Sequence, residues 1–197
     1  MQDKPIVLAC SIFKHELELL TNDEDLNFST QYMSSMLHMD PEQLDNKILE
    51  NKNNLLSNNK NIVLLYGDCC PNMNTYGKEP GISRTIGINC IEIFLGKEHY
   101  RKLRKEGAFF LMPEWTLRWK EVFKYELKLE GEVAREFMNE FHTKIIYLDT
   151  EQIEIPSDIL NEIKKYTGLP VEILKANTLE LKKSLDIALR ELQINRK

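Results

Sequence analysis

One short apolar run constrains the fold of this chain more than any other feature. Ile62 to Tyr66 is an uninterrupted apolar stretch, and Gly67 ends it. A run this short and this apolar is typical of a strand that is buried on both faces, as in a parallel sheet. In open α/β sheets, ligands bind beyond the carboxyl ends of such strands. We therefore expect a site at the residues that follow, which include Cys69 and Cys70.

The rest of the chain alternates short apolar runs with helical segments, and no repeat or low-complexity linker interrupts this order. Asp40 followed by Pro41, for example, is a well-formed helix start. The pattern predicts an α/β fold, a three-layer sandwich with a mostly parallel sheet, Rossmann-like and forming a single domain over residues 1–197. No glycine-rich nucleotide-binding motif is present. The other predicted strands cover Ile6–Cys10, Phe28–Leu37, Ser83–Ile86, Ala108–Met112, Lys144–Leu148 and Val171–Leu174.

Composition narrows the classes of function. The net charge of −5 and the isoelectric point near 5.5 argue against a nucleic-acid partner and against an anionic membrane surface. No apolar run approaches the roughly 20 residues that span a bilayer, and the N-terminus lacks the pattern of a signal peptide. We expect a cytoplasmic protein, in which structural disulfides are rare. Its four cysteines then favour metal binding, catalysis or plain burial.

Three cysteines and one histidine share a place in the predicted topology. Cys10 ends the first strand, His38 the second and Cys69 the central strand, while Cys90 opens a helix that Asn89 caps. The carboxyl ends of parallel strands meet at one edge of a sheet, so these side chains should converge. Three thiolates and an imidazole are a known zinc ligand set. Three thiolates alone could instead hold an iron–sulfur cluster.

Other interpretations stay open. No C-x-x-C pair is present, and each cysteine taken singly is more often a small buried hydrophobe. Cys90, in the first turn of a helix, is expected to have a lowered pKa. Trp115 and Trp119 are spaced as a core-facing pair, although Trp115 and Glu114 could also line the cofactor pocket at the end of the preceding strand.

The chain resembles an uncharacterised family, domain of unknown function 1638, at short motifs that occur in the same order over most of its length. The motifs are Ala9-Cys10, Leu37-His-Met-Asp-Pro41, Tyr66-Gly-Asp-Cys69, Asn89-Cys-Ile91 with Phe94-Leu-Gly96, and Pro113-Glu-Trp115. Position by position, Cys10, His38, Cys69 and Cys90 match the family pattern. The resemblance therefore points to the same four residues as the topology.

The departures from the family pattern are local. Cys70 stands where the family has Gly, Ile88-Asn89 where it has His-Asp, and Glu114 where it has Gly. A role of the missing His or Asp cannot be carried over, and Cys70 or Glu114 could substitute for it.

The resemblance implies a setting more than a reaction. Similar proteins occur in anaerobic archaea and bacteria and accompany corrinoid-dependent methyltransferases. It implies a metal-binding protein of one-carbon metabolism, with zinc or an iron–sulfur cluster, a corrinoid as a further cofactor, and a corrinoid protein or methyltransferase as partner. An enzyme that uses the metal and a non-catalytic metal, cluster or corrinoid carrier are both consistent with this setting. A soluble α/β domain with buried thiols and no metal is the remaining alternative.

Overall fold

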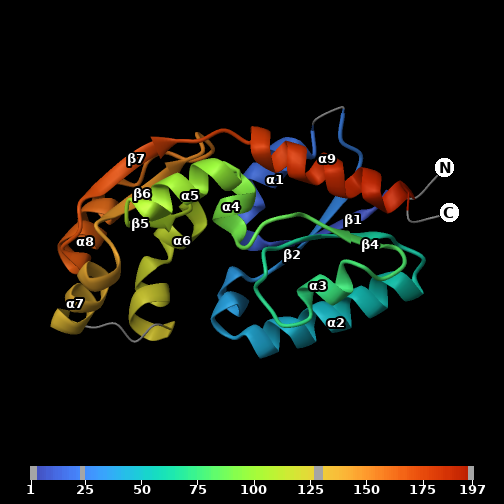
Figure 1. Cartoon of the computed structure of the whole chain (residues 1–197), viewed down its shortest axis with the longest axis horizontal. Helices are drawn as coiled ribbons and strands as arrows, with labels where there is room; N and C mark the ends of the chain where they lie inside the picture. The colour runs from blue at the N-terminus through green and yellow to red at the C-terminus, as the bar shows by residue number, and fades with distance from the viewer. Residues whose placement is uncertain (1–3, 23–24, 127–130, 195–197) are drawn as a thin grey trace. The chain divides into compact units, whose positions relative to one another are not determined.

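The computed structural model describes residues 4–22, 25–126 and 131–194 (Figure 1). By their internal contacts, these residues form two compact units. Unit 1 comprises Met1–Lys97 together with Thr178–Lys197, and unit 2 comprises Glu98–Asn177. Unit 1 is therefore built from both ends of the chain.

Unit 1 contains a four-stranded parallel sheet. Its strands are β1 (Ile6–Cys10), β2 (Ser29–Met33), β3 (Ile62–Leu65) and β4 (Ile82–Arg84), in the spatial order β2-β1-β3-β4. The two central strands are aligned so that Val7 lies opposite Val63, and both side chains are fully buried. All four residues of β3 are buried, as the uninterrupted apolar run predicts.

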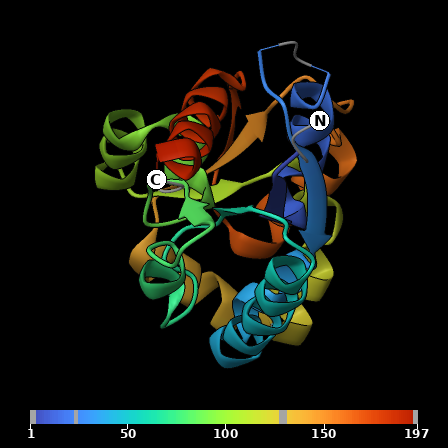
Figure 2. The same ribbon diagram turned by 90° about the vertical axis from the view of Figure 1, so that its right-hand side faces the viewer.

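Helices cover both faces of this sheet (Figures 1 and 2). Helix α2 (Pro41–Ser57) packs against β3 on one face, and α9 (Leu179–Ile194) packs against β3 and β4 on the other. The carboxylate of Asp40 accepts a hydrogen bond from the backbone N–H of Gln43 at 2.9 Å, which caps α2 as predicted. Ser83 Oγ donates to the carbonyl of Ala188 at 2.7 Å and ties α9 to β4. The other helices of unit 1 are α1 (Lys14–Leu20), α3 (Met73–Tyr76), α4 (Cys90–Leu95) and the 3-10 helices Ser11–Phe13 and Ser35–Met39.

Unit 2 contains a separate parallel sheet, with β6 (Lys144–Asp149) between β5 (Ala108–Leu111) and β7 (Val171–Lys175). Gly168 follows helix α8 (Ser157–Thr167) and ends it, in the left-handed conformation with φ of 76° that glycine tolerates best. The helices of this unit are α5 (Lys97–Lys105), which begins at the junction, α6 (Pro113–Leu117), a π-helix (Glu121–Glu126), α7 (Gly131–Phe141) and α8 (Ser157–Thr167).

The predicted α/β class with parallel strands is confirmed. All of the paired strands described in the two sheets run parallel. The strands are divided between two sheets, however, because β4 and β5 do not pair. An alternation of strands and helices shows that parallel sheets form, but not which strands are neighbours. The single domain over residues 1–197 stays a prediction. Among the described residues, none of the helices is long and apolar enough to cross a bilayer.

Candidate metal centre

Two of the four predicted ligands lie where the sequence places them. Cys10 is the last residue of β1 and is buried. Cys90 is the first residue of α4, and the side chain of Asn89 caps this helix by accepting the backbone N–H of Glu92 at 2.8 Å. An apolar run and a helix cap are both local signals, which is why the sequence shows them directly.

The prediction that His38 ends the second strand is wrong. Strand β2 ends at Met33, and the 3-10 helix Ser35–Met39 places His38 one turn farther along the chain. Ser34 causes the break, because its hydroxyl accepts the N–H of Met36 and competes with strand pairing. The backbone N–H of Ser35 donates to Ser11 Oγ at 2.9 Å, which ties this helix to the segment just after Cys10.

The prediction that Cys69 directly ends the central strand is also wrong, since β3 ends at Leu65. Between them lies a close backbone approach. A Cβ atom added to Gly67 would lie 2.3 Å from Asn89 Cα, so only glycine fits there. The next residue, Asp68, donates its N–H to the carbonyl of Ile88 at 3.0 Å. This contact brings the segment of Cys69 against the start of α4.

The four side chains come together as a hydrogen-bonded row. The thiol of Cys90 interacts with both Cys10 and Cys69, and Cys69 in turn interacts with the imidazole of His38. The row thus runs from the end of β1, through α4 and the segment after β3, to the 3-10 helix. All four residues belong to unit 1.

The members of the row differ strongly in their pKa values. The hydrogen bond from Cys90 and the contact with His38 lower the pKa of Cys69 to about 5, although burial opposes this. The hydrogen bond with Cys69 raises the pKa of His38 above its ordinary value. Cys69 is therefore a thiolate at neutral pH. The expectation that Cys90 has the lowered pKa is wrong, because its hydrogen bonds to Cys10 and Cys69, together with burial, raise the pKa of Cys90 well above the ordinary value.

The row does not yet have the geometry of a metal site. Within the described parts of the chain, no group of three or more His, Cys, Asp or Glu side chains surrounds a common point at ligand distances. The row contains soft thiolate and imidazole donors, which suit zinc or an iron–sulfur cluster. Its members would have to turn toward one point for an ion to bind.

Tyr66 is a site residue that the sequence reasoning missed. It directly follows β3 and is only 2 % exposed, and its hydroxyl has no hydrogen-bond partner among the residues that the structure describes. Burial, followed by the negative charge available on Cys10, Cys90 and the other thiols, raises the pKa of Tyr66 well above its ordinary value. A hydroxyl at the end of an otherwise aliphatic run, next to Gly-Asp-Cys, was the signal in the sequence.

Comparison with known proteins identifies the family. Residues 32–185 match the family described as Protein of unknown function (DUF1638). The chain belongs to this family. The matched range includes His38, Cys69 and Cys90, whereas Cys10 lies before it. Neither the search of curated proteins nor that of solved structures found a match.

In this DUF1638 protein, Cys70 faces a different partner from the cysteines of the row. Burial and a hydrogen bond to the carboxylate of Asp45 raise the pKa of Cys70 to about 12. Asp45 also accepts from Asn72 Nδ2 at 2.7 Å and from the hydroxyl of Tyr76 at 3.1 Å. Cys70 is therefore a neutral thiol that belongs to a structural network beside the row.

The predicted cofactor residues Glu114 and Trp115 belong to unit 2, in α6. Glu114 Oε1 pairs with Arg118 Nη1 at 3.1 Å, and its side chain is 16 % exposed. The ion pair already engages this carboxylate. That these two residues line the same pocket as the cysteines stays a prediction.

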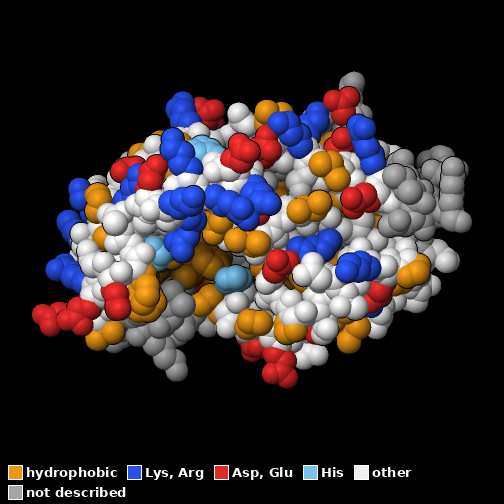
Figure 3. All heavy atoms as spheres, in the orientation of Figure 1, with side chains coloured by type: hydrophobic (Ala, Val, Ile, Leu, Met, Phe, Trp, Pro, Cys, Tyr) orange, Lys and Arg blue, Asp and Glu red, His pale blue; other side chains and the backbone are white. Residues whose placement is uncertain are grey.

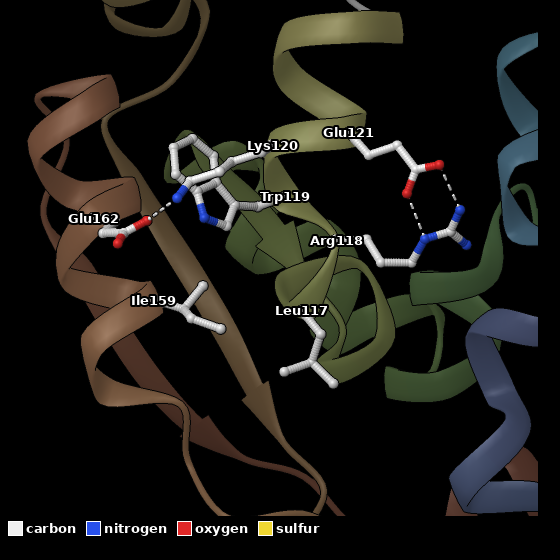
Figure 4. Close-up of a pocket in the computed structure, with 7 residues that line it drawn as sticks. All are labelled: Leu117, Arg118, Trp119, Lys120, Glu121, Ile159 and Glu162. Carbon is white, nitrogen blue, oxygen red and sulfur yellow. Dashed lines mark hydrogen bonds and ion pairs between the residues drawn. The ribbon is translucent and has the colours of Figure 1, made fainter.

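Unit 2 of the DUF1638 protein has its own hollow, of about 700 Å³, beside α6 and α8. Leu117 and Ile159 face it from the two helices, and Lys120 Nζ bridges to Glu162 Oε2 at 2.8 Å (Figure 4). The surface over α5 is different, because Lys and Arg side chains gather there (Figure 3). This basic surface lies on a chain of net negative charge.

Proposed function

We propose that Cys10, His38, Cys69 and Cys90 bind a zinc ion and that this DUF1638 protein acts through that ion. The observation that supports the proposal is the hydrogen-bonded row. Four residues separated by as many as 80 positions in the sequence bring only zinc-ligating atoms to one place. A buried set of thiols with no function would not require a histidine at its end.

The direct contacts between the thiols favour a mononuclear site over a cluster. Tetrahedral ligands at the usual Zn–S distance of about 2.3 Å lie about 3.8 Å from one another. The thiol of Cys90 shares hydrogen bonds with Cys10 and Cys69, so these three thiols are direct neighbours, as a mononuclear site requires. The thiolates of an iron–sulfur cluster bind different iron atoms and therefore stand farther apart. For one zinc ion to bind, the side chains of the row would have to turn toward a common point.

The protonation states of the row also favour the binding of a metal ion. Cys69 is a thiolate before any ion binds, so it can make the first bond. Zinc would then displace the protons of the remaining thiols, because metal ligation favours the thiolate. His38 is exposed, unlike the buried Cys10, and is the ligand that a substrate could most easily replace. A replaceable fourth ligand is a mark of catalytic rather than structural zinc.

The biochemical setting of the proposal follows from the family resemblance. The zinc ion would activate a thiolate as methyl acceptor, or polarise a substrate, in corrinoid-dependent methyl transfer. A corrinoid protein or methyltransferase is the partner that this setting implies. A carrier that delivers metal, cluster or corrinoid to such an enzyme is the alternative, and turnover by the purified protein would separate the two.

The test is elemental analysis and a visible spectrum of protein purified without oxygen. The expected result is a colourless protein with one zinc ion per chain. Cys69→Ser should lose that zinc, whereas the matched control Cys70→Ser should keep it, because Cys70 faces Asp45. A brown protein that contains iron and sulfide would show that the residues hold an iron–sulfur cluster instead of zinc. A wild-type protein that takes up neither metal, even when supplied with zinc under reducing conditions, would refute the proposal.

A further inference from the structure

The buried hydroxyl of Tyr66 points to a second component of the site. We propose that the metal centre binds a small anionic ligand, and that Tyr66 donates a hydrogen bond to it. This inference rests on the proposed function, since the ligand would bind to the zinc ion. It adds the class of ligand, an anion with a lone pair toward Tyr66, and a residue that selects it.

The hydroxyl of Tyr66 lacks a hydrogen-bond partner among the described residues. A buried polar group without a hydrogen bond costs about 1–3 kcal/mol, so such groups are uncommon in native proteins. Of the protein atoms that the structure describes, no oxygen, nitrogen or sulfur accepts from the hydroxyl of Tyr66. Ala9 of β1 lies opposite Leu65 of β3, so the residues that follow them, Cys10 and Tyr66, stand at neighbouring strand ends. Tyr66 therefore lies beside the row, although its hydroxyl is not bonded to it.

The surroundings of Tyr66 hold its side chain in place, away from solvent. Its side chain is 98 % buried at the end of β3, where solvent does not reach the hydroxyl. Thr85 Oγ1 donates to the backbone carbonyl of Tyr66 at 3.5 Å, and the fully buried Leu65 precedes it in the strand. The close approach at Gly67 fixes the residue that follows. A partner would therefore have to come to Tyr66.

The donor on the protein sets the chemistry of the ligand. A tyrosine hydroxyl keeps its hydrogen at neutral pH and can therefore donate it. The matching atom on the ligand must be an acceptor, and the zinc ion favours one with negative charge. Zinc sites can take a fifth ligand or exchange one, and His38 at the surface is the exchangeable member. Carboxylates, thiolates and small inorganic anions all fit this description.

Azide is the probe, titrated into the cobalt-substituted protein and followed by the visible bands of the metal. Tyr66→Phe should bind cobalt as wild type does, but its azide affinity should fall about tenfold, as expected for a hydrogen bond to a charged group. The matched control is Tyr76→Phe, whose hydroxyl bonds Asp45 instead, and its azide affinity should not change.

The outcomes separate the two proposals. A wild-type protein that binds no cobalt would refute the metal site itself. A cobalt protein that does not respond to azide, or whose Tyr66→Phe variant binds azide as tightly as wild type, would refute the role of Tyr66 alone. If the variant does not fold, the infrared stretch of azide bound to wild-type protein decides. That band should shift between H₂O and D₂O, and an unshifted band would overturn the inference.

Discussion

The thiol row of unit 1 and the hollow of unit 2 differ in how their polar groups are matched. In the hollow, Arg118 bonds both Glu121 oxygens at 2.7 and 2.8 Å, and Lys120 pairs with Glu162. In the row, Cys69 and Cys90 contact their neighbours in ways that strongly shift their pKa values, and Tyr66 stays unpartnered among the described residues. The hollow of unit 2 has a volume of about 700 Å³, whereas the thiolate of Cys69 and the unpartnered hydroxyl of Tyr66 belong to unit 1. Unmet polar groups and displaced pKa values are the features by which the row, rather than the hollow, is proposed as the site.

Gly67→Ala should produce the largest effect, because it separates two of the segments that form the row, those of Cys69 and Cys90. The added Cβ would meet Asn89 Cα at 2.3 Å, and the backbone cannot move aside without losing the Asp68–Ile88 hydrogen bond. We expect a loss of about 3 kcal/mol in the free energy of unfolding, measured in urea, and a weakened uptake of zinc.

Gly77→Ala is the matched control for this prediction. Gly77 has φ of −64°, and the three atoms nearest to its added Cβ belong to the side chain of Arg84, which can shift more readily than the backbone that Gly67 would meet. Its loss of stability should be clearly smaller. Equal losses in the two variants would show that the approach of Gly67 to Asn89 is not special.

The second prediction concerns the alkylation of Cys69 in metal-free protein as pH changes. The thiolate is the reactive form, and the pKa of Cys69 is about 5, so its rate with iodoacetamide should rise through pH 5 and stay level above it. Cys90→Ala removes the largest cause of the low pKa. Its rise should therefore move toward the ordinary thiol value of about 8.5.

Peptide mass spectrometry after short exposures would assign the modified cysteine at each pH. The raised pKa of Cys90 means that it should react after Cys69 at every pH tested. If Cys90 were labelled before Cys69 at low pH, the thiolate of the row would be Cys90 and the prediction would be wrong.

These results show which parts of the site a sequence can reveal. Cys10 at a strand end and Cys90 after the Asn89 cap depend on neighbours in the chain, and both positions were predicted. His38 was misplaced because Ser34 breaks an otherwise plausible strand, and a serine is only a weak signal for that break. The low pKa of Cys69 depends on His38 and Cys90, which reach it through tertiary contacts. No local pattern contains that information.

The fold shows the same division. The apolar runs located Val63 and Ile146 in strands, because burial of both faces leaves a mark on the sequence itself. The split into two sheets depends on which strands pair. β4 and β5 do not pair, and the order of elements along the chain does not encode this.

The smallest effect is expected from Lys120→Ala, in the hollow of unit 2. Its ion pair with Glu162 is more than half exposed on both sides, and pairs of this kind contribute little to stability. The unfolding midpoint should equal that of wild type within error. The comparison is Arg84→Ala in unit 1, where a guanidinium that is 13 % exposed bonds Asp68 at 2.8 Å and Asn74 at 2.6 Å. That variant should lose roughly 1–3 kcal/mol, because it removes a largely buried side chain together with its hydrogen bonds to a charged and a polar group. Equal losses in the two variants would mean that the matched charges of the hollow are as important to the fold as the contacts that hold the thiol row together.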